Sequence, residues 1–315
     1  MSTADNTADK TAAKTAIEPA IRTAIRAVGL GRRYGRKWAL RACTLDIPAG
    51  RVVGLVGANG AGKSTFLNLA VGLLRPTEGV IEVLGGRPGH DAVELAKVGF
   101  LAQDVPLYDT LTVGDHLRLG ARTNPRWDRD SAARRIARAG LDHSQKAGGL
   151  SGGQRAQLAL AVAIGKRPEL LVLDEPVASL DPLARREFLA DLMELAADGL
   201  SIVLSSHLLA DVERVCDHLV VLSDGHACVS GDVDELLATH RLLVGARRTS
   251  ESLPGVHTVI HESHTDRQTT LLVHATQPIL DPRWTVTDVG LEELVLAYMA
   301  SPRSASPSPV LRQVG

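Results

Sequence analysis

One short stretch limits the possible fold more than any other, the glycine-rich segment GANGAGKS at residues 57–64. It fits the pattern G-x-x-x-x-G-K-[ST] and lies between RVVGLVG (51–57), which predicts a buried strand, and KSTFLNLAVGLL (63–74), which predicts a helix. Glycines let the backbone N–H groups of such a loop turn inward around phosphate oxygens, and the helix start adds partial positive charge. The segment therefore predicts a phosphate-binding loop inside a strand–loop–helix unit.

The side chains of this loop have separate predicted roles in binding a nucleotide. We expect Lys63 to reach the β- and γ-phosphates, the Ser64 hydroxyl to coordinate Mg²⁺, and Thr65 to help hold the α-phosphate. An ordinary glycine turn is the alternative, and the ordered strand, loop, lysine and helix argue against it. The predicted phosphate-binding residues are Gly57, Ala58, Asn59, Gly60, Ala61, Gly62, Lys63, Ser64 and Thr65.

Apolar segments alternate with predicted helices along much of the chain. ELLVLDEP (169–176) is apolar on both faces, as a central parallel strand is, and SIVLSSH (201–207) and VGFLAQ (98–103) predict two further strands. LARREFLADLMELAADG (183–199) predicts an amphipathic helix that ends at a glycine. This alternation predicts an α/β fold with a mainly parallel core sheet.

Two regions before residue 200 depart from that alternation. Residues from about 107 to 165 lack β-branched runs and are rich in helix formers, which predicts a helical insertion. TLDIPAGR (44–51) and GVIEVLGGRPG (79–89) carry turn residues beside short strands, so we expect an antiparallel β flank.

The two ends of the chain differ from its middle. After about residue 240, TVIHE (258–262) and TTLLVHA (269–275) predict short strands and GLEELVLAYMA (290–300) predicts a closing helix, which together suggest a small C-terminal α+β appendage. The two terminal stretches are poor in apolar residues or rich in Ser and Pro, and we expect disorder there. The predicted divisions are a disordered tail over 1–22, a main domain over 23–239, the appendage over 240–300 and a second disordered tail over 301–315.

Polar residues follow the predicted parallel strands at the point where each strand ends. Asp174 and Glu175 end LLVLDEP, Gln103 ends VGFLAQ, and His207 ends SIVLSSH. Ligands of open parallel sheets bind beyond these carboxyl ends, so the four side chains can reach a γ-phosphate or its metal. We expect Asp174 to hold Mg²⁺ through its water shell and Glu175 to act on the attacking water as a general base. The predicted catalytic residues are Lys63, Gln103, Glu175 and His207, and the predicted metal ligands are Ser64, Gln103 and Asp174.

A second glycine-rich turn, LSGGQ at 150–154, opens another predicted helix within the insertion. Ser151, Gly152 and Gly153 offer a hydroxyl and free N–H groups to an anion. One phosphate loop already covers the phosphates of one nucleotide, so a second cradle has no evident role on that nucleotide. It makes sense if it closes over a nucleotide held by another copy, and a two-fold dimer would then satisfy both sites at once.

The chain resembles the ATP-binding subunits of ABC (ATP-binding cassette) transporters. The motifs occur in the family's order, namely Walker A GANGAGKST, Gln103, signature LSGGQ, Walker B LLVLDEP, D-loop ASLDP and His207. They cover roughly residues 25–238, and the ordered set is far more specific than any single motif. The resemblance implies a P-loop NTPase fold, the ABC cassette, over 23–239, with ATP and Mg²⁺ as cofactors.

The resemblance also implies roles for residues that patterns alone do not assign. Tyr34 matches an aromatic residue that stacks on adenine in this family. A head-to-tail dimer would hold two ATP molecules at its interface, where Ser151, Gly153 and Gln154 of one subunit contact the γ-phosphate bound by the other. Asp181 would run across the interface and link the two sites. Neither site lacks its hydrolysis residues, so a homodimer with a second identical ATP-binding subunit is the simplest expectation.

Composition limits the possible partners. The formal net charge is −1, so no basic excess points to nucleic acid, and we expect none as a partner. The three cysteines are scattered without metal-ligand spacing, which is typical of reduced thiols in the cytosol. The longest apolar runs are far shorter than a membrane span.

Because no membrane span is predicted, the resemblance implies a separate integral-membrane permease. Its coupling helix would dock between the insertion and the segment QDVPLYDTLTV (103–113). We therefore expect a cytoplasmic protein held peripherally at the inner face of the cell membrane. Arg134, Arg135 and Arg138 in the insertion are expected on a solvated helix face, with acidic loops of the permease as the alternative.

Three functions remain open at this point. The short appendage with its acidic closing helix resembles exporter subunits of the ABC-2 type, which include drug- and antibiotic-efflux ATPases, so export is favoured. An importer subunit would have nearly the same cassette. A soluble ABC ATPase acting on ribosomes or DNA is disfavoured, because such proteins usually carry two cassettes or a long coiled coil, and this chain has neither.

Overall fold

A six-stranded sheet forms the centre of the molecule, in the computed structural model that describes residues 23–178, 180–248 and 255–301. Its strand order is β5-β6-β7-β3-β8-β9, and all neighbours are parallel except β8 and β9. Every residue of β3, β6 and β7 is buried, which explains why the apolar residues of these strands do not alternate with exposed polar ones. The strands are β3 (Val52–Val56), β5 (Val98–Leu101), β6 (Leu170–Asp174), β7 (Ser201–Ser206), β8 (His218–Ser223) and β9 (His226–Asp232).

An antiparallel sheet flanks this centre, as the sequence predicts. It contains β1 (Thr23–Tyr34), β2 (Lys37–Pro48) and β4 (Glu78–Val83), in the order β2-β1-β4. Its inner residues share one apolar core with α1 (Lys63–Ala70) and with β3. Both strands are 12 residues long and are joined by a turn at Gly35 and Arg36, whereas the sequence pattern predicts only the end of β2.

Five helices of the described residues lie around the central sheet, and the sequence predicts two of them, α1 and α6. The helices here are α1, α2 (Ala92–Ala96), α6 (Pro182–Ala197), α7 (Leu209–Val215) and α8 (Val233–Thr239). α1 is shorter than the expected 63–74, because Gly72 adopts a φ of +79° and turns the chain away. α6 ends as predicted, with Gly199 in the left-handed region at a φ of +87°.

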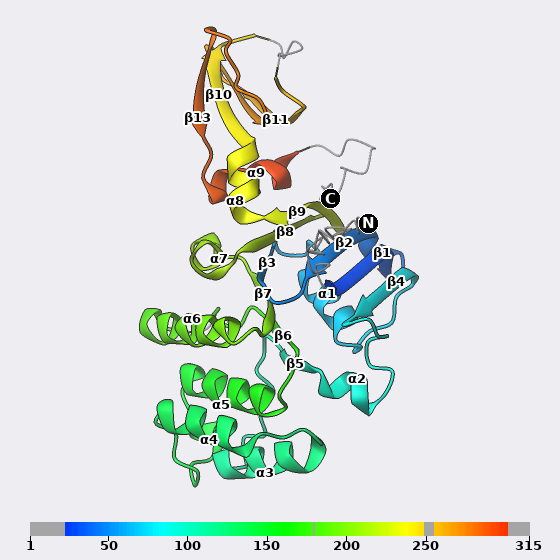
Figure 1. Cartoon of the computed structure of the whole chain (residues 1–315), viewed down its shortest axis with the longest axis vertical. Helices are drawn as coiled ribbons and strands as arrows, with labels where there is room; N and C mark the ends of the chain where they lie inside the picture. Colours follow the sequence, from blue (N-terminus) through cyan, green and yellow to red (C-terminus); the bar gives the residue numbers. More distant parts are fainter. Residues whose placement is uncertain (1–22, 179, 249–254, 302–315) are drawn as a thin grey trace, which may run out of the picture.

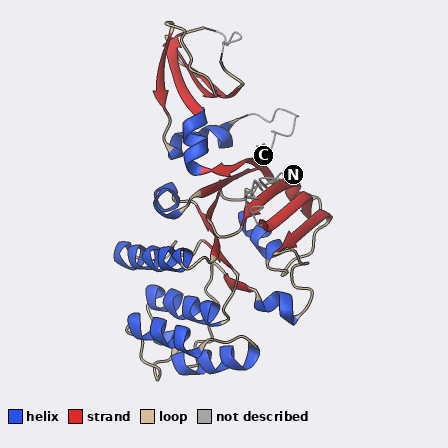
Figure 2. Cartoon of the chain, viewed as in Figure 1, coloured by secondary structure: helices blue, strands red, loops and turns tan. Residues whose placement is uncertain are grey.

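The helical insertion occupies one end of the molecule (Figures 1 and 2). It contains α3 (Val113–Thr123), α4 (Arg129–Arg138), a short 3-10 helix (Ala147–Gly149) and α5 (Gly152–Gly165). α5 belongs to two cores, since Leu158 packs with the insertion and Leu160 and Ile164 pack with the central sheet. The expectation of solvated arginines is wrong for Arg135, whose side chain is 10% exposed and paired with Asp191 of α6.

The C-terminal appendage lies at the opposite end of the molecule (Figure 1). Its antiparallel sheet has the order β11-β12-β10-β13, and only β11 and β12 were expected from the sequence. The closing helix α9 packs on the central sheet, because Leu291 and Leu294 share a core with Val221 of β8. The elements are β10 (His240–Ala246), β11 (Thr258–His264), β12 (Gln268–His274), β13 (Trp284–Asp288) and α9 (Leu291–Ala300).

The expected disordered tails lie outside the described residues, apart from Ser301. The Ser301 hydroxyl donates to the carbonyl of Ala297 at 2.7 Å and so ends α9.

Core packing predicts that alanine substitutions at two positions of α6 differ greatly in their effect on stability. Phe188 is completely buried, so Phe188→Ala should lower the free energy of unfolding by about 3–5 kcal/mol through lost contacts and a cavity. Met193, which is 43% exposed on the same helix, serves as the control. Met193→Ala should change the free energy of unfolding by less than about 0.5 kcal/mol. Urea unfolding of both variants provides the measurement, and equal losses would contradict this packing.

Candidate nucleotide-binding site

The register of the parallel strands brings the predicted site residues to one edge of the central sheet. Val56 of β3 is paired with Ser206 of β7, and Asp174 of β6 is paired with Ser205 of β7. The next residue after each strand therefore leaves from the same edge. These residues are Gly57 after β3, Glu175 after β6 and His207 after β7.

The phosphate loop requires glycine at both of its ends. A Cβ atom on Gly57 would lie 2.3 Å from the carbonyl oxygen of Leu222, and one on Gly62 would lie 2.6 Å from that of Ala39. Gly62 also has a φ of +106°, which disfavours any other residue. The second contact shows that β2, which carries Ala39, supports the loop where α1 begins.

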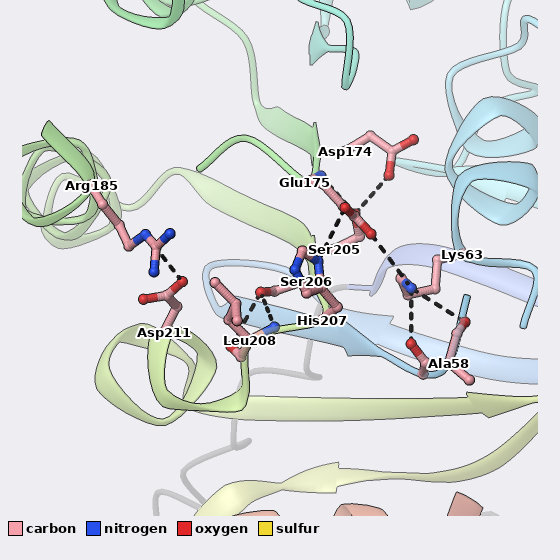
Figure 3. Close-up of polar contacts among 11 residues, drawn as sticks. Ala58, Lys63, Asp174, Glu175, Arg185, Ser205, Ser206, His207, Leu208 and Asp211 are labelled. Carbon is pink, nitrogen blue, oxygen red and sulfur yellow. Dashed lines mark hydrogen bonds and ion pairs between the residues drawn. The ribbon is translucent and has the colours of Figure 1, made fainter. Parts of the chain in front are cut away.

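A chain of polar contacts joins the loop to the ends of β6 and β7 (Figure 3). The ammonium group of Lys63 donates to the carbonyl of Gly57 at 2.9 Å and lies 3.6 Å from Oε1 of Glu175. Oε2 of Glu175 lies 3.2 Å from Nδ1 of His207. Lys63 is 5% exposed and Glu175 is 13% exposed, so neighbouring protein groups rather than water surround most of both charges. For Lys63 these groups are the carbonyls of Gly57 and Ala58 together with Glu175, and for Glu175 they are Lys63 and His207.

Ser205 holds the carboxylate of Asp174 and the backbone of Glu175 in the Walker B segment. Its hydroxyl donates to Oδ1 of Asp174 at 2.7 Å and accepts from the backbone N–H of Glu175 at 2.8 Å. Glu175 has a φ of +48°, a left-handed conformation that is unfavourable for a residue with a side chain. The hydrogen bond from its N–H therefore helps to hold a strained position beside Lys63.

The residues expected to bind Mg²⁺ offer suitable atoms. A hydroxyl (Ser64), a carboxylate (Asp174) and an amide oxygen (Gln103) are the oxygen ligands that this ion prefers. Asp174 is buried at the sheet edge, and Ser64 directly follows Lys63 in α1. No cluster of three or more His, Cys, Asp or Glu side chains gathers within the described ranges. The set thus fits an ion that also takes ligands from phosphates and water.

The remaining predicted residues lie outside this cluster. Gln103 is exposed in a turn two residues after β5. Tyr34 ends β1, is half exposed and has the Arg32 guanidinium carbon 4.9 Å from its ring centroid. Asp181 caps α6, where its carboxylate accepts from the N–H groups of Leu183 and Ala184, each at 3.0 Å.

The signature turn forms the start of α5. Ser151 caps this helix, because its hydroxyl accepts from the N–H of Gln154 at 3.3 Å. The side-chain oxygen of Gln154 accepts in turn from the N–H of Ser151 at 3.0 Å. Ser151 and Gln154 are thus held by each other, and Gly153 faces Ala184 of α6. Asn59, Gly60 and Ala61 form the turn of the phosphate loop, and Thr65 follows in α1.

Sequence reasoning missed Ser205, although a signal for it exists. SIVLSSH is apolar from Ile202 to Leu204 and then carries two serines, and a hydroxyl in a fully buried strand needs a partner. Parallel pairing with LLVLDEP would have offered Asp174 as that partner.

The role of Ser205 can be tested against a serine at the other end of β7. Ser205→Ala should cost about 1–3 kcal/mol of stability, because it leaves Asp174 and the N–H of Glu175 unpaired. It should also lower ATP turnover at least about tenfold through displacement of Glu175.

The control is Ser201, whose buried hydroxyl accepts from the N–H of Gly50 at 2.9 Å. Ser201→Ala should cost similar stability and change turnover less than about twofold. Urea unfolding and steady-state ATPase rates separate the two effects, and equal turnover in the two variants would contradict the assignment.

Comparison with known proteins places the whole arrangement in one family. The family described as ABC transporter matches residues 40–178. The chain is 32% identical over 231 residues to the ABC transporter ATP-binding protein YxlF of Bacillus subtilis (strain 168), covering 72% of this chain and 77% of that protein. It is 36% identical to Nod factor export ATP-binding protein I of Rhizobium leguminosarum bv. viciae (64% and 67% covered). It is 34% identical to the thiamine import ATP-binding protein ThiQ of Jannaschia sp. (strain CCS1) (62% and 88% covered).

Solved structures agree with this placement. The structure of an ATP binding subunit of an ABC transporter superimposes with a TM-score of 0.62 at 30% identity, covering 68% of this chain and 92% of that one. The dimeric bacterial ABC transporter cassette MJ0796 superimposes with a TM-score of 0.59 at 26% identity, covering 66% and 98%. The mainly parallel sheet with its P-loop and flanking antiparallel sheet is thus the ABC cassette fold. The chain belongs to the ABC transporter family as an ATP-binding, ATP-hydrolysing subunit.

Proposed function

We propose that two copies of this chain close over two ATP molecules and thereby drive a separate membrane permease, with export as the direction of transport. The observation that carries the proposal is the pair of glycine-rich helix starts in one chain, each of which is suited to bind an anion. One is the phosphate loop before α1, and the other is the capped signature turn before α5. The second has its groups satisfied within α5 and stands apart from the Lys63 cluster, as expected if it serves another copy.

The ATP-binding roles follow from the contacts of the cluster. Lys63 exchanges its contact with Glu175 for the β- and γ-phosphates, which leaves Glu175 free to accept a proton from water. His207, which pairs with Glu175, orients that carboxylate and faces the γ-phosphate. Ser64, Asp174 and Gln103 hold Mg²⁺, which neutralises phosphate charge when bound. Tyr34 stacks on adenine, with Gln103 as the link between the nucleotide and the permease.

The signature groups are suited to a phosphate of the second copy. The Ser151 hydroxyl accepts a bond from Gln154, and a hydroxyl that accepts still has its own proton to donate. Gly153 has no side chain to keep a phosphate from the helix start, and Gln154 lies beside it. Asp181 begins α6 next to this turn and links the two ATP sites across the interface.

The permease proposal concerns the site of action. No helix of the described residues is long and apolar enough to cross a bilayer. We place the chain at the inner face of the cell membrane, held there by an integral-membrane permease that binds beside the helical insertion, as in the family to which it belongs. The proposed domain boundaries, a cassette over 23–239 and an appendage over 240–300, leave that insertion within the cassette.

The direction of transport rests on relatives and on the appendage. Export is supported by similarity to the Nod factor export protein and by the small α+β appendage, which suits an efflux ATPase, including one for drugs or antibiotics. Import is the second candidate, because the thiamine import protein is similarly related. Uptake of radiolabelled candidate substrates into inside-out membrane vesicles distinguishes them, since only an exporter accumulates substrate there in an ATP-dependent way.

Hydrolysis should depend on Glu175 and binding should not. Glu175→Gln should lower steady-state ATP turnover by about 10²- to 10⁴-fold, because the general base is lost. It should bind ATP at least as tightly as the parent, because Lys63 no longer has to leave a carboxylate.

The control is Glu169, which directly precedes β6 as Glu175 directly follows it. Glu169 lies on the surface and pairs with Arg126 at 3.1 Å. Glu169→Gln should alter turnover less than about twofold. Phosphate release and fluorescent-ATP titration measure the two quantities. Undiminished turnover in Glu175→Gln would refute the assignment of the base.

Attachment to a permease predicts a defined fractionation behaviour. Affinity-tagged chain expressed in its own cells should sediment with membranes, be released by alkaline carbonate and co-purify from detergent with one integral-membrane protein in fixed stoichiometry. Gradient sedimentation and mass spectrometry measure this. Migration with ribosomes, or a membrane-free cytosolic pool alone, would contradict a transport role.

A further inference from the structure

Two neighbouring helices begin at the residues proposed to meet the second copy. Ser151 caps α5 and Asp181 caps α6. The helices pack against each other, since Leu160 of α5 and Phe188 of α6 share one apolar core. Figure 1 shows α5 beside α6, between the central sheet and the rest of the insertion. The relative position of Ser151 and Asp181 therefore depends on how α5 is held against α6.

The first contact holds the two helix starts together. A Cβ atom on Gly153 would lie 3.1 Å from the Cβ of Ala184, so only a glycine lets the first turns approach so closely without a shift. The next residue of α6, Arg185, lies 4.0 Å from the carboxylate of Asp211 in α7 (Figure 3). The start of α6 thus packs closely against the signature turn and lies beside the helix that follows His207.

The second contact is a buried carboxylate one helix turn beyond Phe188. Oδ2 of Asp191 accepts from the side-chain amide of Gln157 in α5 at 3.0 Å. The same oxygen lies 3.0 Å from the guanidinium of Arg135 in α4, and the two side chains are only 8% and 10% exposed. Asp191 therefore connects α6 to both α4 and α5 at a place from which water is largely excluded.

A second arginine of α4 also lies near the Asp191 carboxylate. Arg138 of α4 places its Nε atom 3.7 Å from Asp191 and donates to Glu194 of α6 at 2.8 Å. Burial lowers the pKa of the Arg135 guanidinium from its ordinary value, and the charge of Asp191 acts in the opposite direction. Arg135 is thus a desolvated cation whose neighbouring carboxylate offsets part of its cost.

Stability alone is a weak reason for such a group. Buried ion pairs are often no more stabilising than apolar residues of the same size, because desolvation offsets the attraction. Apolar contacts already hold α5 on α6 through Leu160 and Phe188. The polar contacts restrict the relative orientation of the helices, because the Asp191 carboxylate contacts Gln157 of α5 and Arg135 of α4 at the same time.

We propose that Asp191 is a positioning residue for ATP-driven closure, which holds α4 and α5 on α6 so that Ser151 and Asp181 reach the second copy as one unit. This rests on the proposed function, because it assumes that two copies close over ATP. Asp191 lies outside the Lys63 cluster and acts through the orientation of two helix starts.

The experiment uses the full chain carrying Glu175→Gln as the parent. Light scattering gives the ATP concentration at which half of the protein is dimeric. Adding Asp191→Asn removes the charge and keeps the volume, and it should raise that concentration about tenfold, as expected for coupling within one buried network. Fluorescent-ATP affinity of the dilute monomer should change less than about twofold, because the phosphate loop is untouched.

Two further variants control for charge and for chemistry. Glu187→Gln removes an exposed carboxylate one turn earlier on α6 and should leave the dimerisation midpoint unchanged within about twofold. Asp191→Glu keeps the charge and should recover part of the lost dimerisation. An unchanged midpoint in Asp191→Asn overturns the proposal, and so does an equal loss of ATP affinity in the monomer. A parent that never dimerises with ATP refutes the proposed function, and the present proposal falls with it.

A second pair of variants covers the case in which Asp191→Asn does not fold. Gly153→Ala places a methyl group against Ala184 and should raise the dimerisation midpoint. Adding Ala184→Gly removes the opposing methyl and should restore the midpoint, if the effect passes through the α5–α6 contact. No restoration would mean that the methyl acts on the nucleotide itself, which overturns the proposed positioning by α6.

Discussion

Parallel pairing of β3, β7 and β6 is the constraint on which the rest of the structure depends. It sets Val56, Ser206 and Asp174 at one edge, so the residue after each strand enters the same small space. Three segments that are far apart in the sequence thereby contribute Lys63, Glu175 and His207 to one cluster. A change in the register of these buried strands would be costly, because it would disrupt their packing. It would also move Lys63, Glu175 and His207 away from one another.

The cluster itself consists of groups that are unfavourable alone. Lys63 is buried, Glu175 is nearly buried and has a left-handed backbone, and Asp174 is buried beside it. Each is compensated by a neighbour, the first two by each other and Asp174 by Ser205. A cation and a carboxylate that neutralise each other are suited to exchange partners when phosphates and a cation enter together.

The sequence predicts the parts of this fold whose chemistry is local. The glycine pattern before Lys63 and the apolar runs before Asp174 and His207 need no distant partner to be recognised, and the α/β fold they predict is confirmed. The sequence did not predict features that depend on contacts between distant segments, such as the burial of a charged side chain or the pairing of strands. Arg135 has the pattern of a surface arginine, yet its side chain is 10% exposed and lies 3.0 Å from Asp191 of another helix. β10 and β13, which were not predicted, are paired although they are distant in the sequence.

The central claim is that each ATP lies between the phosphate loop of one copy and the signature turn of the other. The most direct measurement is the crystal structure of Glu175→Gln grown with Mg²⁺ and ATP. The account predicts a two-fold dimer in which Ser151 Oγ of one copy lies within about 3.2 Å of the γ-phosphate held by Lys63 of the other. ATP bound at Lys63, with Ser151 of every copy remote from any phosphate, would contradict it.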